Sequence, residues 1–244
     1  MKDIKSAVIL AAGMGTRLRG VTNNMIPKGF LKIEDKGLVE RSIENLRSVG
    51  IKKIYIATGH LSEFYENLAK KNDFIEVKKN ENFANTGSMA SLAIFKSILN
   101  EDFLLLESDL IYEKRALIEC MNYSGKDCVL VSGKTNSGDE VYIELKEGSL
   151  HNACKDKAKV ESVYGELVGI CKISKELFDT MVSQYENTSV AQYHYEDALV
   201  DSAKTMKIGC HKVEDLIWAE IDDESHLKRV KNDIIPKLRI KNEI

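Results

Sequence analysis

A short glycine-containing loop near the start of the chain is the segment whose residue types most clearly indicate chemistry. It follows the apolar run at residues 7–10 and reads AAGMGTR at residues 11–17. Glycines let backbone N–H groups approach phosphate oxygens, and a loop that follows a parallel strand lies at the ligand-binding edge of a sheet. The sequence therefore predicts a phosphate-binding loop at residues 11–17.

Two common phosphate-binding motifs do not fit this loop. The dinucleotide motif GxGxxG requires a glycine at position 18, which is Leu18. A Walker loop requires Gly-Lys-Ser/Thr, but the next glycine, Gly20, is followed by Val21. Both motifs are excluded.

Two cations accompany the loop. Arg17 follows the second glycine, and Lys28 lies in the string PKGF at residues 27–30. A guanidinium can bind two phosphate oxygens at once, and a lysine supplies a point charge. The pair predicts a polyphosphate ligand; the alternative is a tight turn with two solvated cations.

Alternating strands and helices must position these residues. The hydrophobic pattern predicts strands at 7–10, 54–57, 74–77, 103–106 and 129–131, and helices at 38–49, 61–69 and 88–99. From about residue 138 it predicts antiparallel strands at 141–145 and 166–173, helices at 174–185 and 195–204, a strand at 217–221 and a helix at 224–235. We expect one α/β domain with a Rossmann-like, mostly parallel sheet flanked by helices and an antiparallel insertion.

Composition excludes several other classes. Hydrophobic residues make up 43% and charged residues 30%, and the net charge of −3 argues against a general nucleic-acid binder. The five cysteines form no CxxC pair, and no apolar run reaches 18 residues. We expect reduced thiols, a cytoplasmic location, and neither a membrane nor a nucleic-acid partner.

Eight strings, PKGF among them, carry a resemblance to a known family. They are PKGF (27–30), TGH (58–60), NENFANTGSM (80–89), LLLESDLIY (104–112), SGDEVY (137–142), GELVGI (165–170), YEDAL (195–199) and EIDDESHL (220–227). Essentially the whole chain resembles the 2-aminoethylphosphonate cytidylyltransferases, which are relatives of the bacterial phosphocholine cytidylyltransferases. These enzymes belong to the nucleotidyltransferases that activate small phosphorylated metabolites.

The resemblance implies a fold of the nucleotide-diphospho-sugar transferase type in a single domain, 1–244. Residues 1–135 would bind CTP, 136–215 would bind the acceptor, and 216–244 would supply a second metal carboxylate and a C-terminal helix. The implied reaction transfers CMP from CTP to 2-aminoethylphosphonate and releases pyrophosphate. Both substrates are small molecules, and whether the chain forms a homodimer stays open.

The resemblance also assigns roles. Arg17 would hold the triphosphate, and Lys28 would stabilise the reacting phosphorus as the second catalytic residue. Asp109 and Asp222 would bind Mg²⁺, which prefers one or two carboxylates together with phosphate oxygens. The alternative for each aspartate is a helix cap.

The expected nucleotide-binding residues lie in three segments: the phosphate loop, the stretch that contacts the base, and the end of the strand at 103–106. They are Leu10, Ala11, Ala12, Gly13, Gly15, Thr16, Asn80, Asn85, Thr86, Gly87, Ser88 and Ser108.

Acidic residues dominate the expected acceptor site. Its members are Asp139, Glu140, Glu166, Tyr195 and Glu196. A primary ammonium needs acceptors for three N–H groups, whereas a trimethylammonium needs an aromatic cage. Because Trp218 is the only tryptophan, 2-aminoethylphosphonate is favoured over phosphocholine. Two further hypotheses are a sugar-phosphate nucleotidyltransferase and a non-catalytic nucleotide-binding subunit.

Overall fold

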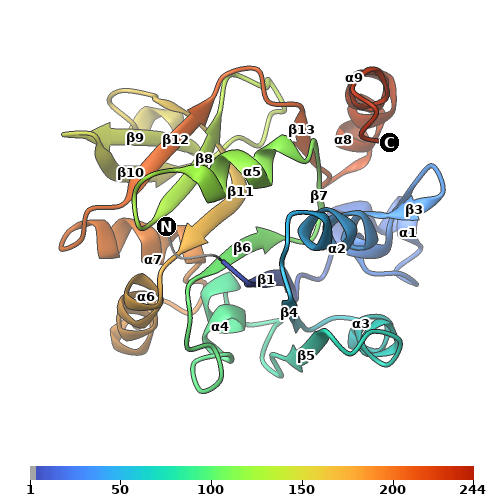
Figure 1. The fold of residues 1–244 in the computed structure, drawn as a ribbon, viewed down its shortest axis with the longest axis horizontal. Coiled ribbons are helices and arrows are strands. Elements are labelled where there is room, and N and C mark those ends of the chain that lie inside the picture. The colour runs from blue at the N-terminus through green and yellow to red at the C-terminus, as the bar shows by residue number, and fades with distance from the viewer. Residues whose placement is uncertain (1–3) are drawn as a thin grey trace.

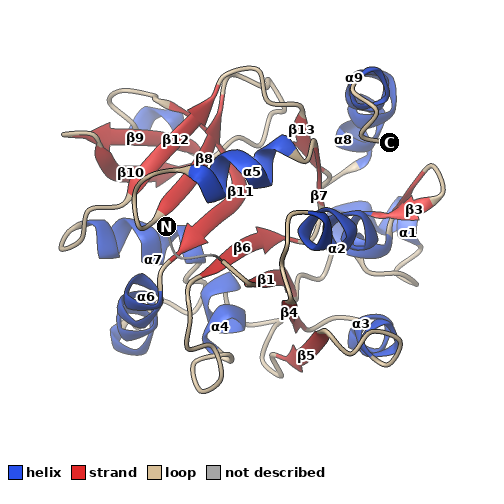
Figure 2. Cartoon of the chain, viewed as in Figure 1, coloured by secondary structure: helices blue, strands red, loops and turns tan. Residues whose placement is uncertain are grey.

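A nine-stranded mixed sheet forms the centre of the protein in the computed structural model, which describes residues 4–244. Figures 1 and 2 show the strands and the surrounding helices. The strands of this sheet are β1 (Ser6–Ala11), β4 (Lys53–Thr58), β5 (Ile75–Lys79), β6 (Phe103–Glu107), β8 (Cys128–Ser132), β9 (Tyr142–Lys146), β10 (Ser149–Cys154), β11 (Gly165–Ile173) and β12 (Gly209–Val213).

The helices lie outside this sheet, as do two short ladders. The helices are α1 (Arg19–Thr22), α2 (Leu38–Ser48), α3 (Ser62–Ala69), α4 (Ser88–Ala93), α5 (Arg115–Asn122), α6 (Lys175–Asn187), α7 (Tyr195–Ala203), α8 (Glu224–Arg229) and α9 (Ile235–Ile240). The ladders pair β2 (Lys32–Ile33) with β3 (Lys36–Gly37), and β7 (Leu110–Tyr112) with β13 (Trp218–Glu220). Among residues 4–244, no helix combines the length and the hydrophobicity that a membrane span requires.

The first half of the chain builds the parallel part of the sheet. β1 pairs in parallel with both β6 and β4, and β4 pairs in parallel with β5. All six residues of β1 are buried, as expected for a strand that is covered on both faces. The carboxyl ends of β1 and β6 therefore meet at one edge of the sheet, where the glycine-containing loop and Asp109 follow.

Alternate residues of the strands face two separate cores. Val8 and Leu10 of β1 pack with α4, α6 and α7, whereas Ala7 and Ile9 pack with α2, α3 and α5. This alternation follows from the two-residue period of a strand. A third cluster joins α1 and the start of α2 to α8 and α9. Figure 1 shows α8 and α9 beside the short strand β13.

The second half of the chain adds the antiparallel part. β11 runs antiparallel to β6, β8 and β9, and β10 pairs with β9. The predicted α/β architecture with an antiparallel insertion is thus confirmed. The division into 1–135, 136–215 and 216–244 stays a prediction, and residues 1–3 of its first part lie outside the described residues.

Several elements differ from those expected. The helix predicted for 88–99 ends at Ala93, although Phe95 and Leu99 stay buried because the chain continues in tight turns. Sequence patterns gave no sign of β10 and β12, whose strands depend on pairing with β9 and β8. The helix predicted for 224–235 is interrupted by a π-helical turn at Val230–Ile234.

Candidate active site

A cleft of about 440 Å³ opens at the carboxyl ends of β1 and β6. The predicted phosphate loop forms one wall. Of the expected nucleotide-binding residues, those that line the cleft are Leu10, Ala11, Ala12, Gly13, Gly15, Thr16, Thr86, Gly87, Ser88 and Ser108. The structure therefore brings together three segments that are far apart in the sequence.

The phosphate loop requires a glycine at position 15. Gly15 has φ of 60°, in the left-handed region that favours glycine. A Cβ there would also lie 3.0 Å from Cγ of Lys28, so a side chain would push against the lysine. The loop and Lys28 are thus packed against each other before any ligand binds.

Lys28 joins two carboxylates at the floor of the cleft. Its Nζ lies 2.8 Å from Oδ2 of Asp109 and also contacts Asp222. Burial disfavours the charged ammonium, but the two carboxylates outweigh it and raise the pKa of Lys28 above its ordinary value. Burial likewise opposes the Asp222 carboxylate, but Lys28, its largest favourable neighbour, holds the pKa of Asp222 well below its usual range.

The backbone holds Asp109 and Asp222 together. β7 begins directly after Asp109 and pairs with β13, which ends just before Asp222. The N–H of Ile221 also donates to the carbonyl oxygen of Asp109 at 3.1 Å. This short ladder positions two carboxylates that are distant in sequence on either side of one cation.

Two further carboxylates complete an acidic cluster. Oxygen atoms of Glu107, Asp109 and Glu220 lie within 4.8 Å of one another. Burial, then nearby carboxylates, raises the pKa of Glu107 to about 8 and that of Glu220 to about 11. Such crowded oxygen ligands fit a divalent cation, which would replace protons as the neutralising charge.

Glu107 and Glu220 were not among the predicted site residues. Each precedes a predicted metal ligand by two positions, Asp109 and Asp222 respectively. In extended chain, side chains two residues apart point to the same side. This spacing was the signal in the sequence that could have identified them.

Arg17 links the phosphate loop to the antiparallel insertion. Its guanidinium lies 2.8 Å from Oδ2 of Asp139 and 2.7 Å from Oδ2 of Asp222, and 51% of its side chain is exposed. Asp139 in turn binds Lys155 at 2.8 Å. Two carboxylates thus hold the half-exposed guanidinium beside the acidic cluster, although Arg17 itself is not among the residues that line either cavity.

The opposite wall of the cleft is the predicted base-binding stretch. Asn80 is buried, and its side-chain amide donates hydrogen bonds to the hydroxyls of Thr86 and Ser91, which stabilises this wall from the protein interior. The side chain of Asn85 donates instead to Asn82. Residues of the cleft that the sequence did not reveal are Met14, Pro27, Tyr65, Phe83, Ala84, Ser91, Gln192 and His194.

Gly87 allows this wall to rest on the segment that precedes α7. A Cβ on Gly87 would collide with the backbone of Tyr193. The close approach is fixed by two backbone hydrogen bonds, from Gly87 to Ala191 at 3.1 Å and from Met89 to Tyr193 at 3.3 Å. Only glycine fits there without moving the wall.

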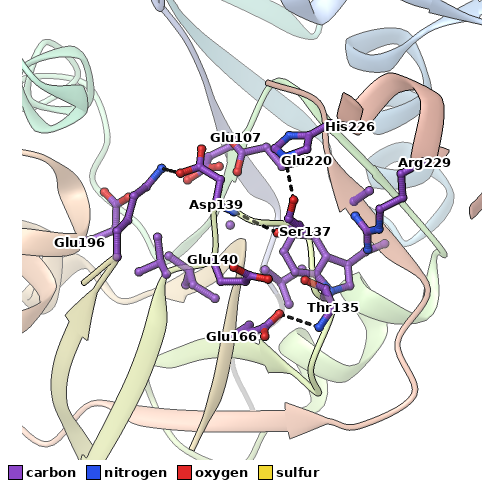
Figure 3. A pocket seen from close by; sticks show the side chains of 17 residues that line it. Glu107, Thr135, Ser137, Asp139, Glu140, Glu166, Glu196, Glu220, His226 and Arg229 are labelled. Carbon is purple, nitrogen blue, oxygen red and sulfur yellow. Dashed lines mark hydrogen bonds and ion pairs between the residues drawn. The ribbon is translucent and has the colours of Figure 1, made fainter. Parts of the chain in front are cut away.

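A second, smaller pocket of about 60 Å³ adjoins the cleft on the side of the insertion. Figure 3 shows its lining, with Glu196 at one end of the view and Arg229 at the other. The expected acceptor residues that line it are Asp139, Glu140, Glu166 and Glu196. Residues not expected there include Thr135, Trp218, His226 and Arg229.

Tyr195, the remaining expected acceptor residue, lines the larger cleft instead of the pocket. Its side chain is 2% exposed, and its hydroxyl donates to Glu107 at 2.6 Å. Glu107, Glu196 and Glu220 line both cavities. The two cavities therefore meet at the acidic cluster.

A nucleotide-sized cleft over a phosphate loop, with paired carboxylates and a lysine at its floor, defines an α/β enzyme site for polyphosphate chemistry. The nucleotidyl transferase family matches residues 6–139, more than half of the chain, and the chain belongs to this family. The predicted nucleotidyltransferase class is thereby confirmed. Families of this kind commonly use a divalent metal, in keeping with the acidic cluster.

Individual relatives cover different parts of the chain. The bifunctional protein GlmU of Methanococcus maripaludis is 32% identical over 70% of this chain and 41% of its own length. The bifunctional IPC transferase and DIPP synthase of Aquifex aeolicus is 24% identical over 95% of this chain and 52% of its own. The chain thus spans about half the length of these two relatives. A 2-aminoethylphosphonate cytidylyltransferase of Lancefieldella rimae is 23% identical over 96% of this chain and 95% of its own.

Solved structures share the fold. The inositol-1-phosphate CTP transferase from T. maritima superposes with a TM-score of 0.83 at 19% identity, over 98% of this chain and 96% of its own. The phosphocholine cytidylyltransferase of Streptococcus pneumoniae gives 0.76 at 22% identity, over 93% and 98%. These likenesses confirm the predicted fold type of the nucleotide-diphospho-sugar transferases.

Proposed function

We propose that the protein transfers CMP from CTP to 2-aminoethylphosphonate. The observation that carries this proposal is the position of Lys28, between Asp109 and Asp222, at the floor of the larger cleft. Glu107, Glu196 and Glu220, which line both cavities, join that cleft to the acidic pocket. An α-phosphate in the cleft and an acceptor in the pocket would therefore meet near one partly buried cation, Lys28.

The reaction needs little beyond positioning and charge. An ionised phosphonate oxygen of the acceptor attacks the α-phosphorus of CTP and forms a new P–O bond. The bond from that phosphorus to the bridging oxygen of the β-phosphate breaks, and pyrophosphate leaves with the electron pair. Negative charge increases on the α-phosphoryl oxygens, and a cation aimed at them lowers the barrier. Lys28 would supply this charge, and Arg17 would bind the triphosphate at the rim.

The acidic cluster would hold Mg²⁺. Asp109 and Asp222 are the proposed ligands, with Glu107 and Glu220 close by. The ion would neutralise triphosphate oxygens and orient them for in-line attack. No protein nucleophile or general base is required, because the phosphonate is already ionised.

Cytosine is the proposed base. The stretch around Thr86 to Ser88, which lines the cleft, offers backbone carbonyls that could accept hydrogen bonds from the 4-amino group. A relative whose match covers 96% of the chain carries the cytidylyltransferase name, as does the solved structure from Streptococcus pneumoniae. Both support CTP over the other nucleotides.

The pocket supports a primary amine as the acceptor head group. Its carboxylates can accept hydrogen bonds from an ammonium, whereas a trimethylammonium has none to donate. Trp218 is the one tryptophan, tyrosine or phenylalanine in the pocket lining that the structure describes. One ring does not make an aromatic cage, so phosphocholine is the weaker candidate.

A pyrophosphate-release assay tests the proposal. CTP, UTP, dTTP and ATP are each offered with 2-aminoethylphosphonate, phosphocholine and glucose 1-phosphate, with and without Mg²⁺. We expect release above background with CTP and 2-aminoethylphosphonate, in the presence of Mg²⁺. Faster release with phosphocholine or with the sugar phosphate would refute the proposed acceptor.

A further inference from the structure

Unpartnered polar atoms gather around the acidic pocket. Among residues 4–244, seven buried side-chain nitrogen or oxygen atoms lack a hydrogen-bond partner. Three of them belong to residues that line this one small pocket: Nε1 of Trp218, Oγ1 of Thr135 and Oε2 of Glu196. Trp218 is only 8% exposed, so its indole N–H is withheld from bulk water. A buried donor without a partner is costly, and a bound ligand could satisfy it.

Arg229 adds a permanent positive charge to the same lining. It projects from α8, and within the described part of the chain no hydrogen bond or ion pair reaches its guanidinium. This is notable because six carboxylate residues line the pocket with it: Glu107, Asp139, Glu140, Glu166, Glu196 and Glu220. The guanidinium can only donate hydrogen bonds, and it matches a carboxylate in shape.

The pocket therefore offers two kinds of partner. Arg229 and the indole of Trp218 can only donate hydrogen bonds, and the hydroxyl of Thr135 can donate one as well. Glu140 and Glu166 can accept: Glu166 already binds the backbone N–H of Thr135 at 2.8 Å and keeps a second oxygen. A ligand with an ammonium group and an anionic, hydrogen-bond-accepting group close together would satisfy both kinds of partner.

We propose that the preferred acceptor is a phosphonate or phosphate whose head group is an α-amino acid, with its carboxylate bound by Arg229, Trp218 and Thr135. This inference rests on the proposed function and specifies its substrate class. The ammonium of the same head group lies against the glutamates. The phosphonate or phosphate points toward Lys28, and the reaction is the CMP transfer described above.

2-Aminoethylphosphonate satisfies only part of this pocket. It supplies the phosphonate and the ammonium but nothing that accepts hydrogen bonds from the head-group donors. Replacing one hydrogen on its amine-bearing carbon by a carboxylate gives 2-amino-3-phosphonopropionate. A site that is built to bind a charged group loses affinity when that group is missing, because its own buried groups stay unpaired.

Two matched pairs of acceptors test the inference. Initial rates with CTP and Mg²⁺ are measured for 2-aminoethylphosphonate against 2-amino-3-phosphonopropionate, and for phosphoethanolamine against phosphoserine. Within each pair the molecules differ only by the carboxylate. We expect kcat/KM to be higher for the carboxylated member by about tenfold or more, the size of one charge-assisted hydrogen bond.

Variants of the pocket residues test whether the preference for the carboxylated acceptor arises in this pocket. The measured quantity is the kcat/KM of the carboxylated acceptor divided by the kcat/KM of its partner without the carboxylate. Arg229→Gln should reduce this ratio about tenfold. Arg229→Lys should reduce it less, because lysine keeps the positive charge. Trp218→Phe removes the indole N–H and should reduce the same ratio. Arg239→Gln is the matched control, because Arg239 pairs with Glu34 away from both cavities and should leave the ratio unchanged.

The outcomes separate this inference from the function on which it rests. If the plain acceptor of each pair is used as well as or better than its carboxylated partner, the inference is overturned and CMP transfer stands. The inference also falls if Arg229→Gln and Trp218→Phe leave the ratio as it is in Arg239→Gln. If none of the four acceptors supports pyrophosphate release from CTP, the proposed function itself fails.

Discussion

The ammonium of Lys28 lies 2.8 Å from the carboxylate of Asp109, so the turn at Lys28–Phe30 is tied to the segment that follows β6. Because this cation lies where charge would increase in the transition state, Lys28→Ala should lower kcat by orders of magnitude. CTP affinity should weaken only modestly, since the backbone of the phosphate loop remains. Turnover and CTP binding, measured separately, check this expectation.

Lys32→Ala is the control for Lys28→Ala, because Lys32 is exposed on β2 and does not line the cleft. Its kinetics should match those of the wild type. A Lys28→Ala protein that is folded and keeps most of its turnover would remove Lys28 from the catalytic residues.

Binding of Mg²⁺ should stabilise the protein as well as activate it. An ion that binds the folded carboxylate cluster, and not the unfolded chain, raises the melting temperature as its occupancy increases. Asp109→Asn keeps the shape of the side chain but loses a charge, so it should raise the Mg²⁺ concentration needed for both effects. Thermal shifts and rates are measured over the same Mg²⁺ titration. Full activity in the presence of a chelator would refute the two-aspartate metal site.

CTP should be used in strong preference to UTP. The two bases differ at position 4, where cytosine donates a hydrogen bond and uracil accepts one, and each buried group left unpaired costs about 1–3 kcal/mol. Gly87→Ala should raise the KM for CTP, because the added methyl group meets the backbone of Tyr193 and shifts the wall around Thr86 and Ser88. Comparable turnover with UTP would mean that this wall does not discriminate between cytosine and uracil.

The glutamates of the pocket should affect the acceptor. Glu140→Gln, Glu166→Gln and Glu196→Gln should each raise the acceptor KM, because an amide accepts a hydrogen bond from an ammonium less strongly than a carboxylate does. Glu140 and Glu166 do not line the larger cleft, so their variants should leave CTP binding nearly unchanged, whereas Glu196 lines both cavities. Glu161→Gln, on the exposed surface, is the control. If acceptor KM is the same in all four variants, 2-aminoethylphosphonate does not use these residues.

The ion pair between Asp201 and Lys204 should make the free energy of unfolding fall as the pH becomes acidic. Lys204 and the hydroxyl of Tyr193 hold the pKa of Asp201 below its ordinary value. A depressed pKa in the folded state gives stability that is complete above the unfolded value of about 4 and is lost as the pH falls through the folded value. Asp201→Asn should therefore be less stable than the wild type at pH 7, and the difference should shrink toward pH 3. Urea denaturation at several pH values measures it; a constant difference would contradict the assignment.

Local patterns in the sequence were sufficient to predict the parallel part of the sheet. The run at residues 7–10 is buried on both faces, and the glycines that follow it mark the loop directly. Lys28 was predicted from the string PKGF that follows this loop, and Asp109 from the resemblance carried by the string LLLESDLIY. In these places the local residue pattern and the final packing agree.

Other features depend on contacts that no local pattern reveals. Trp218 lies in a short apolar run typical of a packing residue, but β13 pairs with β7 and so carries its ring to the acidic pocket. Glu220 lies near Glu107 only because of the same ladder. β10 contains Ser149, His151 and Asn152, an unusual composition for a strand, and becomes one through its pairing with β9.

The short stretch 191–196 contributes to the walls of both cavities. Its backbone at Ala191 and Tyr193 supports the wall around Gly87, Tyr195 lines the nucleotide cleft, and Glu196 reaches the acceptor pocket. Under the proposed function, a change in this stretch should therefore alter base preference and acceptor preference together. A designer who wishes to graft a different acceptor specificity onto this scaffold must exchange residues 86–89 and 191–196 as one unit.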